Sequence, residues 1–497
     1  MKLYELLSGV EIAQGAKVSL DTSVCGVKSD SRRVEKGDAF VCLKGIRCNG
    51  ENYIKDAVNN GASVIICDKA CSACVKGAEF IRVNNTRSAY SHMLSNLYGG
   101  PSDGMRMIGV TGTNGKTTVC KMIASALAES GRRVALIGTL GAAFEGEAYS
   151  LGTMTTPDPE VLYSLLRHFK DRGAEDVVME ASSHALELGK LDPIRFSVGA
   201  ITNITAEHLD FHGNIDSYRR AKARLFAMSE RGVFLCDGIH TSELYNGMPK
   251  EKRLSCSVND STRDIYAESI SCSFENGTSF TVRHGESAYA MYSPMPTYFT
   301  VSNALLAYSV LSALGVEYPS IYRGIASLKG VDGRMERVET NEDFSVYIDF
   351  AHTPDALSGL LTAVRKMKNS GGRILTLFGC GGDRDRSKRS LMGMVASALS
   401  DMVIVTSDNS RSEDPSEIID EIMLGFDKSC PHVRIDDRRK AIEYAIVNAE
   451  KGDMILLCGK GHENYEIDKM GAHSFSEREI VMEALKQRRK MKNAQPL

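Results

Sequence analysis

The sequence Ile-Gly-Val-Thr-Gly-Thr-Asn-Gly-Lys-Thr-Thr occupies residues 108–118 of a chain of 497 residues. The apolar run at 107–110 predicts a buried strand, and the spacing of apolar residues over 117–130 predicts a helix that stops at Gly131. A glycine-rich turn between a strand and a helix lets backbone N–H groups approach phosphate oxygens, and the helix N-terminus adds a favourable dipole. The stretch therefore predicts a site for a nucleoside triphosphate.

The residue types in this loop suit phosphate binding. Lys116 would bridge the outer phosphates, and the hydroxyl of Thr117 would be a ligand of Mg²⁺. The spacing departs from the strict G-x-x-x-x-G-K-[ST] pattern, because five residues separate Gly109 from Gly115. A turn that only joins strand to helix is the alternative, but Gly-Lys-Thr-Thr at such a junction favours ATP or GTP. The predicted nucleotide-binding residues of the loop are Gly112, Thr113, Asn114, Gly115, Lys116, Thr117 and Thr118.

Composition and length limit the class of protein. Hydrophobic residues make up 43% of the chain and charged residues 25%, as in a globular protein with a full core, and the length suggests about three domains. The net charge of −3 gives no reason to expect nucleic acid as a partner. Acidic residues near the N-terminus argue against a secretory signal, and no apolar run is long enough to span a membrane, so we expect a cytoplasmic protein. The odd number of thirteen cysteines favours reduced thiols.

Three α/β units follow one another along the chain. Residues 1–100 contain short strands and a helix, and a turn-forming run, Gly-Gly-Pro-Ser-Asp-Gly at 99–104, marks their end. Residues 101–333 alternate strands and helices around the phosphate loop and include antiparallel strands at 231–300. Residues 334–497 contain four apolar strands separated by helices. The predicted fold class is therefore α/β, with a small first domain, a central parallel-sheet domain and a doubly wound third domain.

Polar residues gather where two predicted strands of the central unit end. Glu180 and Ser182 close the buried strand at 176–180, and His208 follows the next strand. Ligands of open α/β sheets bind outside the carboxyl ends of the strands, so Glu180 and His208 could complete the coordination of Mg²⁺. The alternative is a polar rim that caps neighbouring helices, and for His212 the two interpretations weigh equally.

The third unit repeats this pattern. Each of its four apolar strands ends in a loop of polar residues and glycines, at 351–354, 379–384, 407–411 and 459–463. Parallel strands of a doubly wound sheet place such loops around one crevice. Charge brought to that crevice by several loops favours a binding site over a purely structural role.

Longer motifs resemble the Mur ligase family, whose phosphate loop is shared with folylpolyglutamate synthases. The motifs are Thr-Thr-Pro-Asp at 155–158, Glu-Ala-Ser-Ser-His at 180–184, His-Leu-Asp-Phe-His-Gly at 208–213, Gly-Arg-Met-Glu at 333–336, Asp-Phe-Ala-His-Thr-Pro-Asp at 349–355 and Gly-Lys-Gly-His-Glu at 459–463. They lie in all three units in the expected order. The resemblance implies a UDP-binding N-terminal domain at 1–100, a central P-loop ATPase-like domain at 101–333 and a Rossmann-like domain that binds an amino acid at 334–497.

The resemblance also implies a reaction in the synthesis of a peptidoglycan precursor. ATP would phosphorylate the side-chain carboxylate of D-Glu in UDP-MurNAc-L-Ala-D-Glu, and the amine of a third amino acid would attack the acyl phosphate to form an amide. Because both first reactants are anionic, Lys116 and two Mg²⁺ ions would screen their approach. An acyl phosphate hydrolyses easily, so the domains are expected to close over it. We expect a monomer that does not insert into membranes.

Catalytic roles follow from the same resemblance for Lys116, Glu180, His208 and Lys222. Lys222 matches a lysine that the family carbamylates to N6-carboxylysine; a carbamate offers a second metal two anionic oxygens, where an ammonium would repel it. On the residues alone, an exposed helical lysine is the simpler interpretation of Lys222. The implied metal ligands are Thr117, Glu180, His208 and the carbamate of Lys222. The implied nucleotide contacts outside the loop are Asn303, Arg334, Asp349 and His352.

The muramoyl-peptide would contact residues of the first two domains. Those implied are Ser29, Asp30 and Ser31 beside the uridine, and Thr155, Thr156, Ser182 and Lys190 beside the peptide. Two residues depart from the family pattern, because Leu188 stands where relatives often have Gln and Lys190 where they usually have Arg. Lysine keeps the charge of arginine but lacks its bidentate fork.

The identity of the added amino acid rests on Asp-Asn-Ser-Arg at 408–411, which corresponds to Asp-Asn-Pro-Arg in diaminopimelate-adding members of the family. A planar guanidinium at Arg411 matches the second carboxylate of diaminopimelate, which lysine lacks. Ser410 replaces the usual Pro, which makes the loop less rigid. We expect meso-diaminopimelate, with another stereoisomer or lysine as the alternative. The implied contacts are Arg384, Asp408, Asn409, Arg411, Gly459 and Glu463.

Two other functions compete with this one. A folylpolyglutamate synthase would share the phosphate loop and add glutamate to a folate, but it lacks a separate uridine-binding domain at the position of residues 1–100. A nucleotide-gated binding protein without ligase turnover is the second alternative. The presence of Lys116, Glu180, His208 and Lys222 argues against it.

Overall fold

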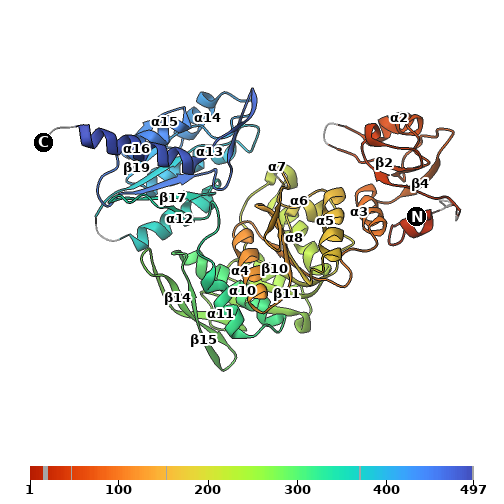
Figure 1. Ribbon diagram of the computed structural model, residues 1–497, viewed down its shortest axis with the longest axis horizontal. Coiled ribbons are helices and arrows are strands. Elements are labelled where there is room, and N and C mark those ends of the chain that lie inside the picture. The colour runs from red at the N-terminus through yellow and green to blue at the C-terminus, as the bar shows by residue number, and fades with distance from the viewer. Residues whose placement is uncertain (15–18, 20, 46–47, 153, 369–370, 495–497) are drawn as a thin grey trace.

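The computed structural model describes residues 1–14, 19, 21–45, 48–152, 154–368 and 371–494. Three lobes, each built on its own sheet, follow one another, so that the two ends of the chain lie at opposite ends of the molecule (Figure 1). None of the helices formed by these residues is both long and apolar enough to cross a membrane.

The N-terminal lobe contains a parallel sheet with the strand order β1–β2–β3–β4. Its elements are α1 (Leu3–Leu6), β1 (Val27–Lys28), η1 (Ser31–Arg33), β2 (Ala39–Val41), η2 (Gly50–Tyr53), α2 (Ile54–Asn59), β3 (Val64–Asp68), β4 (Glu79–Val83) and α3 (Thr86–Leu97). Apolar side chains from both sides of the glycine-rich run at 99–104 belong to one buried cluster, because α3 packs against a helix of the central lobe. The first lobe is therefore attached through a shared core.

The central lobe contains eleven strands in the order β15–β14–β13–β12–β11–β10–β5–β9–β6–β7–β8. The strands from β13 to β6 run parallel, whereas β14 and β15 at one end and β7 and β8 at the other are antiparallel. The strands are β5 (Arg106–Thr111), β6 (Val134–Gly138), β7 (Gly141–Phe144), β8 (Glu147–Tyr149), β9 (Asp176–Glu180), β10 (Phe196–Ile201), β11 (Ser229–Leu235), β12 (Arg253–Ser257), β13 (Ile265–Ser273), β14 (Gly277–His284) and β15 (Ser287–Ser293).

Helices cover both faces of this sheet. They are α4 (Lys116–Glu129), α5 (Pro159–Asp171), α6 (Ser183–Glu187), α7 (Leu209–His212), α8 (Ile215–Ala227), α9 (Ile239–Asn246), η3 (Lys250–Lys252), α10 (Tyr298–Ala313) and α11 (Tyr318–Ser327). Ile108 and Val110 of β5 pack with α4, α10 and α11, whereas Met107 packs on the opposite face with α5. A parallel strand buried on both faces is apolar throughout, which is why the run at 107–110 was recognisable as a strand.

The C-terminal lobe is a second doubly wound unit with the strand order β16–β17–β21–β18–β19–β20. Its elements are β16 (Glu336–Val338), β17 (Ser345–Asp349), α12 (Pro354–Met367), β18 (Ile374–Phe378), α13 (Ser387–Leu399), β19 (Met402–Val405), α14 (Pro415–Met423), β20 (His432–Arg434), α15 (Arg438–Val447), β21 (Met454–Cys458), the hairpin β22 (Tyr465–Asp468) and β23 (Gly471–Ser474), and α16 (Glu477–Ala494). Helices α12, α13 and α14 cover one face, and α15 and α16 cover the other. The predicted class of three α/β domains is confirmed.

The connection into the C-terminal lobe begins at α11, which packs closely on α4. A Cβ atom at Gly324 of α11 would lie 2.3 Å from the Cα of Ala126 in α4, so only glycine allows this approach. Ser125 Oγ donates to the Gly324 carbonyl oxygen at 2.8 Å, and Lys121 Nζ of α4 lies 3.8 Å from the carboxylate of Asp332 in the link. The link is therefore fastened to the helix that follows the phosphate loop.

Candidate active site

The loop between β5 and α4 has the geometry of a phosphate cradle. Gly112 and Gly115 adopt φ values of +138° and +89°. A Cβ atom at Gly112 would lie 1.8 Å from Thr202 Oγ1, and one at Gly115 would lie 2.5 Å from Asn303 Oδ1. Both positions therefore require glycine. Asn303, predicted to contact the nucleotide, projects from α10 against this loop.

Residues at the end of β10 hold the loop from the side. Asn203 Oδ1 accepts a hydrogen bond from Asn114 N at 3.0 Å, and Thr202 Oγ1 donates to the Asn114 carbonyl oxygen at 2.6 Å. Thr113 Oγ1 lies 3.2 Å from the hydroxyl of Tyr218 in α8. These contacts fix the loop without using the N–H groups of the first turn of α4.

Two lysines meet at the same carbonyl of the loop. Lys116 Nζ donates to the carbonyl oxygens of Gly112 and Thr113 at 3.0 and 2.8 Å, and Lys222 Nζ donates to that of Gly112 at 2.8 Å. Lys222 is only 1% exposed and lies 4.3 Å from the centre of the Tyr218 ring. Burial, together with the nearby charge of Lys116, lowers the pKa of Lys222 well below its usual value. The interpretation of Lys222 as an exposed helical lysine is therefore wrong.

Glu180 lies at the carboxyl end of β9 with 1% of its surface exposed. Its Oε1 accepts hydrogen bonds from Thr117 Oγ1 at 3.0 Å and from Thr139 N at 2.8 Å, and its Oε2 accepts one from Thr139 Oγ1 at 3.0 Å. Thr139 was missed by sequence reasoning, although its place directly after the apolar strand β6 would have been a signal. Thr117 and Glu180, two predicted metal ligands, are thus in contact.

The predicted peptide-binding residues of the central domain adjoin Glu180. Thr155 Oγ1 lies within hydrogen-bonding distance of Thr139 Oγ1, at 3.0 Å, and Thr156 Oγ1 donates to the main-chain carbonyl oxygen of Glu180 at 2.8 Å. Ser182 N in turn donates to Thr156 Oγ1 at 3.1 Å. Lys190 lies apart from this chain of hydroxyls and pairs with Asp158 at 2.7 Å. Three of the four predicted residues therefore surround the Glu180 strand end.

His208 belongs to a group of aromatic rings rather than to the Thr117–Glu180 contact. Its ring centre lies 4.8 Å from that of His184, which lies 5.5 Å from that of His212. Burial lowers the pKa of His184 and of His212 to about 4, and it also lowers the pKa of His208. The imidazoles of this group of rings are therefore neutral at pH 7. Within the described ranges, no three His, Cys, Asp or Glu side chains converge in a way that could hold a metal ion.

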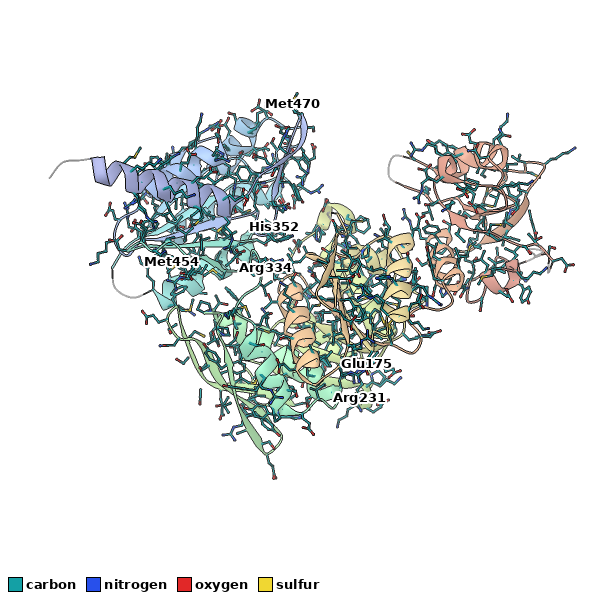
Figure 2. The ribbon with its side chains drawn as sticks, viewed as in Figure 1. Glu175, Arg231, Arg334, His352, Met454 and Met470 are labelled. Atoms are coloured by element: carbon teal, nitrogen blue, oxygen red, sulfur yellow. The ribbon has the colours of Figure 1, made fainter. Side chains whose placement is uncertain are left out.

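A contact between a histidine and a glutamate joins the central and C-terminal lobes. His352 Nε2, in the loop after β17, lies 3.4 Å from Glu207 Oε1, and its Nδ1 donates to the Phe350 carbonyl oxygen at 2.8 Å. Burial opposes ionisation of Glu207, but the contact with His352 outweighs it and lowers the pKa of Glu207. In Figure 2, Arg334 and His352 lie on the side of the C-terminal lobe that faces the central lobe, whereas Met470 marks its far end.

Two further residues of the C-terminal lobe that were predicted to contact the nucleotide lie beside His352. Asp349 accepts hydrogen bonds from Met335 N and Ala351 N at 2.7 and 2.8 Å, which orient its carboxylate at the end of β17. The Arg334 guanidinium stacks 4.7 Å from the centre of the Phe350 ring. Both predicted residues therefore lie in the junction between the two lobes.

The predicted uridine-side residues form the turn between β1 and η1. Asp30 caps η1 and pairs with Arg32, whose hydrogen bonds lower the pKa of Asp30 to about 2. Ser29 Oγ donates to Tyr90 OH at 3.4 Å, and Ser31 is buried. The neighbouring Arg33 makes a bidentate pair with Glu160 of α5, at 2.7 and 2.9 Å, which sequence reasoning missed. That pair places the turn against the central domain near the start of α5.

The predicted amino-acid residues converge at the ends of β18, β19 and β21. Asn409 Nδ2 donates to Glu463 Oε2 at 2.8 Å, and Asn409 Oδ1 accepts from Lys460 Nζ at 3.0 Å. A Cβ atom at Gly459 would lie 2.8 Å from the buried carboxylate of Asp408. Lys460, fully buried, was not predicted as a site residue, because its sequence context does not show that its ammonium points inward.

Arg411 and Arg384 bring two guanidinium groups to this site. Arg411 Nη1 donates to the carbonyl oxygens of Gly382 and Asn409 at 2.8 and 3.2 Å. Burial, and secondarily the charge of Arg384, lower the pKa of Arg411. The charges of Arg384 and Glu463 both act on Arg411, so this site offers cations and an anion to a ligand that carries a carboxylate and an ammonium at one end.

Three Mur ligase domain families match the chain in order. They are the Mur ligase family catalytic domain at residues 23–97, the Mur ligase middle domain at 110–311 and the Mur ligase glutamate ligase domain at 333–461. The chain is 38% identical over 495 residues to a UDP-N-acetylmuramoyl-L-alanyl-D-glutamate--2,6-diaminopimelate ligase from Syntrophomonas wolfei subsp. wolfei, covering 98% of this chain and 99% of that relative. It is 37% identical over 489 residues to the ligase of the same name from Clostridioides difficile, again over 98% and 99% of the two chains.

Solved structures agree with this likeness. A structure of a UDP-N-acetylmuramoyl-L-alanyl-D-glutamate--2,6-diaminopimelate ligase superposes with a TM-score of 0.69 at 30% identity, over 98% of this chain and 99% of that one. Folylpolyglutamate synthase from Mycobacterium tuberculosis gives a TM-score of 0.63 at 17% identity, over 83% of this chain and 96% of that one. The second likeness concerns the fold alone.

Proposed function

Because the chain belongs to the Mur ligase family, we propose that it is an ATP-dependent ligase that joins meso-diaminopimelate to UDP-MurNAc-L-Ala-D-Glu. The γ-phosphoryl group of ATP passes to the side-chain carboxylate of D-Glu, and the amine of diaminopimelate then displaces phosphate to form the amide. Residues 1–100 bind the UDP end, 101–333 bind ATP and the dipeptide, and 334–497 bind the amino acid. The product is a precursor of peptidoglycan made in the cytoplasm.

The choice of amino acid is carried by one observation, the paired guanidinium groups of Arg411 and Arg384. Lysine would place a lone ammonium beside two cations, whereas diaminopimelate adds a carboxylate that both arginines can bind. Glu463, held by Asn409 at 2.8 Å, takes the ammonium at the same end. The charges of the site therefore complement diaminopimelate and oppose lysine.

The phosphate loop supports the first half of the reaction. Lys116 swings from its own loop carbonyls to the outer phosphates when nucleotide binds, since those carbonyls are only weak partners for an ammonium. Asp349 binds the ribose, and Asn303 binds adenine. Thr155, Thr156 and Ser182 hold the dipeptide beside the phosphates, because they share hydrogen bonds with the strand end that carries Glu180.

The residues around Glu180 suit Mg²⁺, which neutralises charge on the phosphates and the acceptor carboxylate when bound. All three hydrogen bonds that this buried carboxylate receives from described residues come from uncharged groups, so a cation would complete its environment. Mg²⁺ keeps few protein ligands beside phosphates and water, which agrees with the contact between Thr117 and Glu180, whereas His208 lies apart from that contact in the group of aromatic rings. A neutral buried amine at Lys222 is the form that adds CO₂, and the resulting carbamate would serve a second ion.

An assay of phosphate release tests this function. Release is expected to require ATP, UDP-MurNAc-L-Ala-D-Glu and meso-diaminopimelate together, with the amide product identified by mass spectrometry. Parallel reactions with LL-diaminopimelate and lysine decide the amino acid, and strong turnover with lysine alone would reject the assignment. A thermal shift with the UDP-dipeptide but none with a folate separates this function from folylpolyglutamate synthesis.

A further inference from the structure

The loop that carries Arg411 is fastened to the loop before α13. Gly382 N donates to the Asn409 carbonyl oxygen at 2.9 Å, and Ser412 Oγ donates to Asp383 Oδ1 at 2.6 Å. Both Asp383 and Arg411 adopt the left-handed backbone conformation, with φ values of +52° and +53°. Non-glycine residues hold that conformation only where their surroundings impose it. A neighbouring group must therefore maintain the backbone conformation of Arg411 and with it the direction of the Arg411 side chain.

Glu413 maintains this backbone conformation, because it connects the loop that carries Arg411 to the loop before α13. Its Oε1 accepts a hydrogen bond from Asp383 N at 2.5 Å, while its own N–H donates to the Ser410 carbonyl oxygen at 3.0 Å. The second contact closes a tight turn around Arg411. A proline at position 410 would restrain only one φ angle, whereas Glu413 ties the whole turn to its neighbour.

Arg389 anchors Glu413 to the domain core. Its Nη2 and Nη1 lie 2.9 and 3.0 Å from Glu413 Oε1 and Oε2, which is a bidentate pair, and its Nη2 also donates to the Gly381 carbonyl oxygen at 3.3 Å. The side chains of Arg389 and Glu413 are 1% and 11% exposed. Arg389 therefore contacts both loops from α13, a helix packed in the core through Met392 and Ala396.

We propose that Glu413 and Arg389 are positioning residues that set the selectivity of the amino-acid site, because they hold the Arg411 guanidinium toward the far end of the incoming diamino acid. This inference rests on the proposed function. The selective contact is then made by Arg411, but its placement depends on a buried ion pair that touches no substrate. Lysine, which has no distal carboxylate, gains nothing from that placement.

The test is Glu413→Gln, which keeps the size of the side chain and removes its charge. We expect the KM for diaminopimelate to rise about 10- to 100-fold, since a charged hydrogen-bond partner of a buried arginine is lost. The kcat and the KM values for ATP and the UDP-dipeptide are expected to stay within about threefold, because those sites are elsewhere. Background turnover with lysine is expected not to change, so the preference for diaminopimelate over lysine falls.

Glu421→Gln is the matched control, because Glu421 Oε2 contacts the same Arg389 at 2.9 Å from α14 but does not touch the Arg411 loop. It is expected to leave the preference for diaminopimelate within about threefold of wild type. Arg389→Lys keeps the charge without the fork and is expected to fall between the two. Circular dichroism of each variant reports whether it folds.

The proposal would be overturned if Glu413→Gln lowered turnover with diaminopimelate and with lysine by the same factor. It would also be overturned if Glu413→Gln and Glu421→Gln changed the preference for diaminopimelate equally. Wild-type turnover with each amino acid tests the proposed function by itself, whereas the ratio of variant to wild type tests the positioning pair. A wild-type enzyme that uses diaminopimelate and a Glu413→Gln variant with unchanged selectivity would therefore reject only the positioning role.

Discussion

Two buried lysines in different lobes show how surroundings decide what a residue does. Lys222 of the central lobe donates one hydrogen bond among the described residues, at 2.8 Å to the Gly112 carbonyl oxygen. Burial and the charge of Lys116 lower the pKa of Lys222, and the charge of Glu207 opposes that shift without reversing it. Lys460 of the C-terminal lobe donates to Asn409 Oδ1 and to the Tyr465 carbonyl oxygen at 3.0 and 2.9 Å. Burial lowers the pKa of Lys460, but Asp408 opposes that shift.

The difference separates a reactive amine from a structural cation. An ammonium has three N–H donors and needs acceptors or an anion when water is excluded. Lys460 has these, so it orients the Asn409 amide and through it Glu463. Lys222 has few, so its neutral form is favoured and its nitrogen lone pair is available for modification. The same side chain thus orients a neighbouring amide in one lobe and is the predicted site of carbamylation in the other.

The largest effect is expected for Lys116→Ala, which removes the charge that disfavours the ammonium form of Lys222. Phosphate release should fall at least about 10³-fold, because charge stabilisation of the transferring phosphoryl group is lost. The melting temperature should change little, since the hydrogen bonds of this side chain to the described residues go to carbonyl oxygens of its own loop. Retained turnover in the phosphate assay would remove Lys116 from the mechanism.

Lys222→Met should reduce kcat/KM about 10²-fold while leaving the melting temperature unchanged or higher. Replacing a buried amine that forms no ion pair with any described residue by an apolar side chain of similar volume removes a desolvation cost. Differential scanning calorimetry and the phosphate assay measure the two effects on one preparation. A marked loss of stability would show that Lys222 is a structural cation like Lys460.

Lys460→Met should do the reverse and destabilise the C-terminal lobe by about 2 kcal/mol, because Asn409 Oδ1 and the buried Asp408 lose their cation. The catalytic loss should appear in the KM for the amino acid and leave the KM for ATP unchanged. Urea unfolding followed with steady-state kinetics tests both statements. An unchanged free energy of unfolding would mean that the hydrogen bonds from Lys460 to its acceptors do not stabilise the lobe.

The smallest effect concerns acid, to which the two lobes should respond at different pH values. His212 has a folded-state pKa of about 4 against 6.5 when unfolded, so the unfolded chain binds more protons and stability falls as the pH drops from about 6.5 to 4. Hydrogen bonds from Arg389 lower the pKa of Glu413 from 4.5 to about 2, so its contribution is full above 4.5 and is lost as the pH falls through about 2.

Free energies of unfolding of the wild type, His212→Asn and Glu413→Gln at pH 7, 5 and 3 measure this difference. Between pH 7 and 5 the wild type should lose stability relative to His212→Asn but keep its advantage over Glu413→Gln. That advantage should shrink only between pH 5 and 3. If the free energies of unfolding of both variants changed with pH in parallel, the assignment of the pKa shifts to His212 and Glu413 would be contradicted.

The sequence was sufficient for the parts of the fold and site that are local along the chain. The phosphate loop, the strand that ends at Glu180 and the four buried strands of the C-terminal lobe were predicted because a parallel strand covered on both faces is a continuous apolar run. The short strands β16 and β20 were not predicted, since each has only three residues, of which a single one is apolar, and they pair only through tertiary context. Membership of β13, β14 and β15 in the central sheet likewise depends on pairing between distant segments.

The supporting contacts of the site were beyond the reach of sequence for the same reason. The supporting contacts join Thr139 to Glu180, Glu207 to His352, and Arg389 to Glu413. The two residues of each contact are separated by 24 or more positions in the chain. Lys460 lies inside a recognised motif, but its burial depends on the hairpin β22–β23. The assigned roles of the site residues stay predictions, whereas their gathering at the strand ends is now a structural fact.

The tight packing of Gly324 against α4 affects how the C-terminal lobe can be placed relative to the phosphate loop. The polypeptide leaves α11 and enters the C-terminal lobe through the link at 328–333, so the pivot for any swing of that lobe is fastened to the phosphate-loop helix. A rotation of the C-terminal lobe about this link would carry Arg411 along an arc whose centre is fixed relative to the phosphate-loop helix. A methyl group added at Gly324 would shift that centre without altering any residue predicted to bind a substrate.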